Sequence, residues 1–185
     1  MQTTTKDIIK KICLLGDPAV GKTSLIRRFV FDMFDDKYIT TIGTKVTKKT
    51  VEVDREVPTG NMHVKITLLI WDILGQREYQ RLHPVYYQGA EGALIVCDST
   101  RKETIGNLAT WVTSFKNVVG NVPVVFLINK SDLVDPEKFD RSEIDNLSRL
   151  HHAPYLPTSA KNGLNVERAF ITVSEALARS LSGNC

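Results

Sequence analysis

The sequence of 185 residues has no long hydrophobic run, few cysteines and little net charge. Its apolar runs are strand-sized, well below the ~20 residues that a membrane-spanning helix needs, and residues 1–11 contain no apolar signal core. Cys13 and Cys97 lie inside apolar runs, where a thiol behaves as a small buried hydrophobe, and the three cysteines show neither metal nor disulfide spacing. These absences argue against a membrane-spanning or disulfide-bonded protein and predict a protein of a reducing, cytoplasmic compartment.

The charges and histidines exclude further functions. The net charge of +3 is too small to imply nucleic-acid binding, and the most basic stretch, around Lys45, Lys48 and Lys49, is expected to be a solvated face of an edge strand. The four histidines show no metal spacing with carboxylates or thiols, and no Ser-His-Asp arrangement can be argued. There are no repeats, low-complexity tracts or linkers, so we expect residues 1–185 to form one domain, with a core of about residues 7–180 and short flexible termini.

Short apolar runs, each followed by a turn and a helical pattern, predict the fold. Near-continuous apolarity means that both faces of a strand are covered, as in a parallel sheet between helix layers. Residues 45–53 alternate only partly with Lys and Thr, so they predict an exposed edge strand that turns into the next strand. The prediction is an α/β fold with a mostly parallel six-stranded sheet, one antiparallel edge strand and helices on both faces. The expected strands are 12–15, 45–53, 64–71, 93–97, 122–128 and 155–156, and the expected helices are 22–31, 103–119, one after a capping box at 140–143, and a last one with an apolar stripe over 166–181.

Residues 16–23, GDPAVGKT, match the phosphate-loop pattern of P-loop nucleotidases. The loop lies between an apolar strand and a helix, as its mechanism requires. Backbone amides of the loop and of the helix N-terminus point at the phosphates and carry partial positive charge. Lys22 adds a full charge near the β and γ phosphates, and the Thr23 hydroxyl can ligate Mg²⁺. The loop predicts a nucleoside triphosphate but not its base.

Residues 129–132, NKSD, predict the base, because they follow the strand 122–128 at the carboxyl edge where ligands bind in open α/β sheets. The Asp132 carboxylate can accept from both N1–H and the 2-amino group of guanine. Adenine offers neither donor, so the carboxylate would be left desolvated and unpaired at a cost on the order of a few kcal/mol. Residues 158–161, TSAK, follow the next strand, and their backbone amides could receive the guanine carbonyl.

Residues 71–76, WDILGQ, close the third strand and predict the chemistry at the terminal phosphate. Asp72 can hold the water shell of Mg²⁺, and Gly75 lets the backbone reach that phosphate. Gln76 is then placed to orient the attacking water. The order and spacing of the whole set, rather than any one residue, favour these roles over a lone strand-end Asp with a turn Gly.

These segments resemble the five guanine-nucleotide motifs of the Ras superfamily of small GTPases, over nearly the whole chain. Residues 38–43 (YITTIG) and 86–90 (YYQGA) are most similar to the Rab branch. The resemblance implies a Ras-like G domain that binds GTP or GDP with Mg²⁺, hydrolyses GTP slowly and controls partner binding through switch I and switch II. It implies catalytic roles for Gln76, Lys22 and Thr41, and magnesium contacts from Thr23, Thr41 and Asp72. The nucleotide-binding residues that it implies are Asp17, Ala19, Val20, Gly21, Lys22, Thr23, Ser24, Phe34, Tyr38, Thr41, Gly75, Asn129, Lys130, Asp132, Ser159, Ala160 and Lys161.

The chain departs from the family at several positions. Pro18 stands where relatives carry Gly or another small residue, and proline removes a backbone amide. Leu74 replaces the usual Ala and puts bulk beside the Gly75 amide that must reach the γ-phosphate. Arg77 replaces a Glu and changes the charge of the surface that partners read. Switch I, residues 32–42, contains no arginine, a residue worth ~10³–10⁵ in rate when it is supplied. We therefore expect slow intrinsic turnover and an arginine from an activating protein in trans.

Two further readings stay open beside the GTPase switch. One is a GTP-dependent binding module with negligible hydrolysis, which Pro18 and Leu74 suggest. The other is a kinase that transfers the phosphoryl group, which would leave Asp132 and Thr41 without a role. We expect a monomer with GTP-state effectors and an exchange factor. The ending SGNC is no C-a-a-X box, so a lipid anchor is not supported, and any peripheral membrane placement is expected to come from partners.

Overall fold

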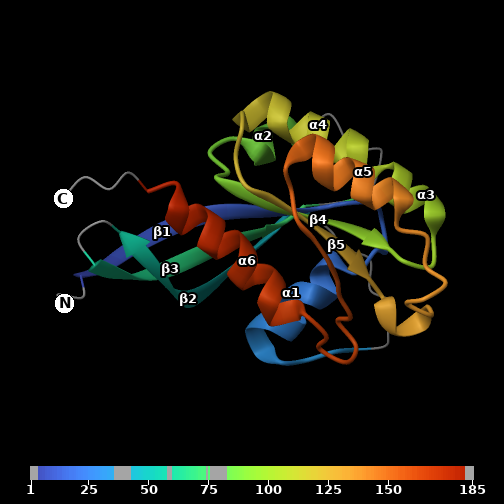
Figure 1. Cartoon of the computed structure of the whole chain (residues 1–185), viewed down its shortest axis with the longest axis horizontal. Coiled ribbons are helices and arrows are strands. Elements are labelled where there is room, and N and C mark those ends of the chain that lie inside the picture. The colour runs from blue at the N-terminus through green and yellow to red at the C-terminus, as the bar shows by residue number, and fades with distance from the viewer. Residues whose placement is uncertain (1–3, 36–42, 58–59, 74, 76–82, 182–185) are drawn as a thin grey trace.

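The computed structural model describes residues 4–35, 43–57, 60–73, 75 and 83–181 of the chain. Figure 1 shows one twisted sheet with helices on both faces. The elements are, in chain order, β1 (Thr4–Leu15), α1 (Lys22–Phe31), β2 (Lys45–Val57), β3 (Gly60–Asp72), α2 (His83–Tyr87), β4 (Gly92–Asp98), α3 (Lys102–Gly106), α4 (Leu108–Val119), β5 (Val124–Asn129), η2 (Ser131–Leu133), α5 (Ser142–His151), β6 (Tyr155–Pro157) and α6 (Val166–Arg179).

The sheet has six strands in the order β2-β3-β1-β4-β5-β6. Only β2 runs antiparallel to its neighbour, and β1, β3, β4, β5 and β6 are parallel. Every residue of β4 and β5 is buried, because helices cover both faces of these central strands. This confirms the predicted six-stranded α/β sheet with one antiparallel edge strand.

Two apolar clusters, one on each face of the sheet, hold the layers together. On one face, α1 and α6 pack on the sheet, and Phe29 stacks on Phe170 with ring centroids 3.9 Å apart. On the other face, α2, α3, α4 and α5 contribute side chains such as Phe115 and Leu147. Figure 1 shows the same division. Burial of each large apolar side chain stabilises such a core by about 1.5–3 kcal/mol.

Several local predictions needed correction, and β2 and β3 also reach Val57 and Gly60, beyond the predicted bounds 45–53 and 64–71. Strand β1 starts at Thr4 rather than at Ile12 and pairs with β3 from Thr4 to Leu14, because apolarity on both faces marked only its central part. The predicted single helix 103–119 is two helices, and the first ends at Gly106, the residue type with the lowest helix propensity after proline.

The predicted capping box at 140–143 forms only in part. Asp140 Oδ1 accepts a hydrogen bond from the Ser142 amide at 2.9 Å. The reciprocal bond from Glu143 is not present among the described residues, because its carboxylate lies beside α3, within 3.2 Å of where a Cβ on Gly106 would stand. In this same described part of the chain, none of the helices has the length and apolarity to cross a membrane.

Candidate functional site

Polar residues from five loops meet at the carboxyl edge of the parallel strands. Gly16 follows β1, Asp72 ends β3, Asp98 ends β4, Asn129 ends β5 and Thr158 follows β6. Ligands of open α/β sheets bind in the crevice at this edge. The topology therefore brings the predicted phosphate loop, Asp72 and the two predicted base motifs to one place.

The phosphate loop is wedged against the sheet at its two glycines. A Cβ on Gly16 would lie 2.1 Å from the Val96 carbonyl oxygen, and one on Gly21 would lie 2.2 Å from Asn129 Nδ2. Both glycines also have positive φ angles, 136° and 101°. Ala19 has φ 61°, a left-handed conformation that costs a non-glycine residue about 1 kcal/mol. The close approach of backbone to sheet explains why the loop needs glycine at both positions.

Lys22 lies against the loop backbone. Its side chain is buried, and Nζ donates to the carbonyl oxygens of Gly16 and Asp17 at 2.8 and 2.9 Å. Burial lowers the pKa of Lys22 from 10.5 to about 8, the nearby carboxylates of Asp72 and Asp17 act against that drop, and the Arg101 guanidinium adds to it. The ammonium group is thus held where phosphate oxygens would approach, but it is only weakly stabilised there without an anion.

The two predicted magnesium contacts outside switch I are in contact with each other. Thr23 Oγ1 donates to Asp72 Oδ2 at 2.5 Å, and Asp72 is almost fully buried. Burial raises the pKa of Asp72, while the Thr23 hydrogen bond and Lys22 act against that rise. A hydroxyl and a carboxylate are the hard oxygen ligands that Mg²⁺ prefers, usually together with waters and substrate phosphates. No group of three or more His, Cys, Asp or Glu that could cage a metal occurs in the described ranges, so this pair is the part of the site that fits Mg²⁺.

Gly75 brings the end of the third strand onto the phosphate loop. A Cβ on Gly75 would lie 2.5 Å from the Gly16 carbonyl oxygen and 2.6 Å from the Asp17 carbonyl carbon. Only glycine fits this approach. Tyr38, Thr41 and Gln76 lie outside the described residues, so their roles stay predictions.

Asn129 joins both base motifs to the phosphate loop. Its side chain is 1% exposed, and Nδ2 donates to the Val20 carbonyl oxygen at 2.8 Å. Oδ1 accepts from the Ala160 amide and from Thr158 Oγ1, both at 3.3 Å. Residue 129 therefore fixes the spacing between the predicted base loop and the phosphate loop.

Asp132 lies at the rim of the site, with its carboxylate oriented by Ser159. The Ser159 hydroxyl donates to Asp132 Oδ1 at 2.6 Å, and Asp132 itself is exposed. Further acceptor sites on the carboxylate remain for a base edge. Phe34 is half-buried against the α1–α6 cluster.

Arg28 holds the 158–161 loop, a role that sequence reasoning missed. Its Nε donates to the Ala160 carbonyl oxygen at 2.9 Å, and its Nη2 to the Lys161 carbonyl oxygen at 2.6 Å. The contact spans 132 positions of sequence, and no local pattern around α1 marks it.

Asp17 was predicted to bind nucleotide, but its side chain turns toward α4. Asn107 Nδ2 donates to Oδ2 at 2.6 Å, and Trp111 Nε1 donates to Oδ1 at 2.8 Å. These two hydrogen bonds hold the negatively charged Asp17 carboxylate on the outer side of the loop. Trp111 is buried in the core, and its indole N–H also anchors the phosphate loop.

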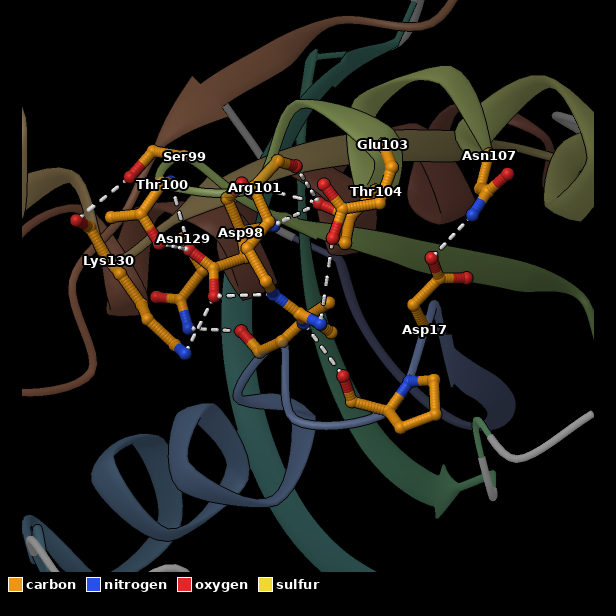
Figure 2. Close-up of polar contacts among 12 residues, drawn as sticks. Asp17, Asp98, Ser99, Thr100, Arg101, Glu103, Thr104, Asn107, Asn129 and Lys130 are labelled. Carbon is orange, nitrogen blue, oxygen red and sulfur yellow. Dashed lines mark hydrogen bonds and ion pairs between the residues drawn. The ribbon is translucent and has the colours of Figure 1, made fainter.

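Figure 2 shows a second group of polar contacts, centred on Asp98, that sequence reasoning also missed. This carboxylate is 1% exposed and pairs with Lys130 Nζ at 2.7 Å and Arg101 Nε at 3.2 Å. Burial acts to raise the pKa of Asp98, but hydrogen bonds from Lys130 and Thr100 hold it below its usual range. Arg101 Nη2 donates to the Pro18 carbonyl oxygen at 2.8 Å.

Comparison with known proteins agrees with this geometry. The Ras family model matches residues 11–179. The chain is 37% identical over 168 residues to Ras-related protein Rab-22A of Homo sapiens, covering 90% of this chain and 82% of that protein. It is 34% identical over 178 residues to Ras-related protein Rab-13 of Rattus norvegicus, covering 96% and 84%. The chain belongs to the Ras family and is a Rab-like small GTPase, an enzyme that hydrolyses GTP to GDP.

Proposed function

We propose that this GTPase is a magnesium-dependent guanine-nucleotide switch with slow intrinsic hydrolysis, whose GTP form binds partners through switch I and switch II. The observation that carries the proposal is the meeting of Lys22, the Thr23–Asp72 pair and Asp132 at one edge of the sheet. One end of this arrangement suits phosphates and a hard cation, and the other suits a base with two adjacent donors.

At the phosphate end, Lys22 and the loop amides carry the charge stabilisation. Lys22 exchanges carbonyl partners for phosphate oxygens, and an anion beside it favours its protonated form. Thr23 and Asp72, with Thr41, would hold Mg²⁺, which neutralises charge that develops on the phosphates during transfer. Gln76 would orient the attacking water, and Gly75 would place its backbone amide toward the terminal phosphate.

At the base end, Asp132 selects guanine. Ser159 orients the carboxylate, and Asn129 and Arg28 support the loop whose Ala160 amide would meet the guanine carbonyl. Asp132→Asn should weaken GTP binding and favour xanthosine triphosphate, whose 2-carbonyl needs a donor. A competition assay between the two nucleotides measures this change, and an unchanged guanine preference would contradict the base assignment.

The rate of hydrolysis is tested by single-turnover cleavage of bound GTP, with wild-type protein and Gln76→Leu. We expect a slow wild-type rate, because residues 32–42 supply no arginine. Gln76→Leu should lower the rate further, because it removes the side chain that would orient the attacking water. A wild-type rate no faster than that of free GTP would favour the alternative, a GTP-dependent binding module with negligible turnover.

The switch itself rests on the γ-phosphate, which would hold Thr41 and the Gly75–Gln76 segment and release them after hydrolysis. GTP-state effectors, an exchange factor and an activating protein that supplies an arginine in trans would read this change. A pull-down that compares protein loaded with a GTP analogue and with GDP tests the proposal, and equal capture by both forms would contradict it.

A further inference from the structure

One buried carboxylate, Asp98, connects the two ends of the nucleotide site. Lys130, from the base motif, pairs with Asp98 Oδ2 at 2.7 Å, and Arg101 pairs with the same oxygen at 3.2 Å. The other oxygen accepts from Thr100, through its amide at 2.9 Å and its hydroxyl at 2.7 Å. Lys130 and Thr100 fix the position of the carboxylate. Asp98 can therefore hold the Arg101 guanidinium in one orientation.

The Arg101 guanidinium then reaches the phosphate loop from its outer side. Nε of Arg101 donates to Asp98, as Figure 2 shows. Nη2 donates to the Pro18 carbonyl oxygen at 2.8 Å, so the planar group spans the two acceptors. A peptide unit is planar, and in the trans form its C=O and N–H point in opposite directions. The described residues contain no cis peptide bond. The hydrogen bond to Pro18 therefore turns the Ala19 N–H toward the opposite, inner side of the loop.

The Ala19 amide is the group that benefits from this orientation. Ala19 has φ 61°, a conformation that a non-glycine residue keeps only when its surroundings hold it. Among the described contacts this amide donates no hydrogen bond, so it is open to an incoming anion. A cation on the carbonyl of the same peptide also polarises the unit and strengthens its N–H as a donor.

A second set of contacts holds the preceding residue, so that two successive loop residues are anchored from the α3–α4 side. Asn107 and Trp111 hold the Asp17 carboxylate, and Arg101 holds Pro18. We propose that Arg101, oriented by Asp98, is a positioning residue for phosphate binding, which fixes the Pro18–Ala19 peptide with its amide facing the phosphates. This role rests on the proposed guanine-nucleotide function and adds a residue to it.

The test compares two ligands that share the base but differ at the loop, GDP and GMP. Each displaces a fluorescent GDP analogue from the full chain with Mg²⁺ present. For Arg101→Gln we expect GDP affinity to fall about tenfold, the effect of losing a hydrogen bond from a charged donor. GMP has no β-phosphate to meet the loop, so its affinity should stay within about twofold of wild type. Arg101→Lys keeps one charged donor, so its GDP affinity should lie between those of wild type and Arg101→Gln.

The control is Lys102→Gln, which removes the same charge from the next residue, an exposed one, and should leave both affinities unchanged. Equal losses for GDP and GMP, or undiminished GDP binding, would overturn the positioning role. Urea unfolding of nucleotide-free protein checks folding, and if Arg101→Gln does not fold, Arg101→Lys carries the comparison. Asp132→Asn separates this proposal from the function beneath it, because it should weaken GDP and GMP together. If it does not, the base assignment fails while the Arg101 comparison still stands.

Discussion

The buried Lys22 predicts how the stability of the nucleotide-free protein depends on pH. Its pKa falls from 10.5 to about 8 on folding, which corresponds to about 3 kcal/mol of free energy at neutral pH. The unfolded chain binds this proton more tightly than the folded one, so stability rises with pH between about 8 and 10.5. Below pH 8 the whole cost is present. The charged amine therefore destabilises the empty site at pH 7, and phosphates would relieve that cost.

The perturbation is Lys22→Met, which keeps an apolar stem and removes the titrating group. Urea unfolding of nucleotide-free protein gives the free energy of unfolding at pH 7, 8 and 9 for both proteins. From pH 8 to pH 9 the wild type should gain about 1 kcal/mol relative to the variant. Buried thiols such as Cys13 titrate in both proteins, so their effect cancels in the difference. Parallel pH dependences for the two proteins would refute the reasoning.

Two further changes probe the metal pair and the base loop. Asp72→Asn removes a carboxylate whose pKa is raised by burial, so the nucleotide-free protein should unfold at a higher urea concentration. It also removes a proposed magnesium contact, so the rate of GDP release should no longer depend on Mg²⁺. A Mg²⁺ titration of the release rate that matches wild type would contradict this. Arg28→Gln removes two donors to the 158–161 loop and should weaken GDP and GMP alike, by about tenfold. The exposed Arg149→Gln is its control, and a loss confined to GDP would show that Arg28 acts on the phosphates instead.

The sheet could be predicted because its strands carry local signals. Strands β4 and β5 are buried throughout and read as continuous apolar runs, and β2 reads as an edge because its residues alternate. The start of β1 could not be predicted, because this part of the strand is packed on one face only. Ile8 and Lys10 are half-buried on that face, and Ile9 on the other face is 67% exposed, so the apolar run that marks a strand covered on both faces is missing. The break at Gly106 carries only the glycine itself as a local signal, and the apolar spacing on both sides of it predicted one continuous helix.

The site divides in the same way. Lys22, Thr23, Asp72 and Asn129 belong to motifs with fixed spacing, and each motif lies next to a strand that carries it to the sheet edge. Asp98 carries no such pattern. Its partners lie at several distances along the chain, and only the folded sheet brings β4 and β5 into the register Asp98↔Asn129 that places Lys130 beside it.

Pro18 shows how a departure from a motif becomes understandable only in three dimensions. From sequence, a proline in the phosphate loop is compatible only if its amide is not needed. In the structure, the hydrogen bond at this residue uses the carbonyl, which accepts from Arg101, and the inward-facing amide is that of Ala19. A proline ring also restricts the backbone of the unfolded loop, so less conformational freedom is lost when the loop is ordered. Pro18 and Arg101 thus act on the same peptide, and the loop keeps its shape without the glycine or other small residue that the family resemblance implies at this position.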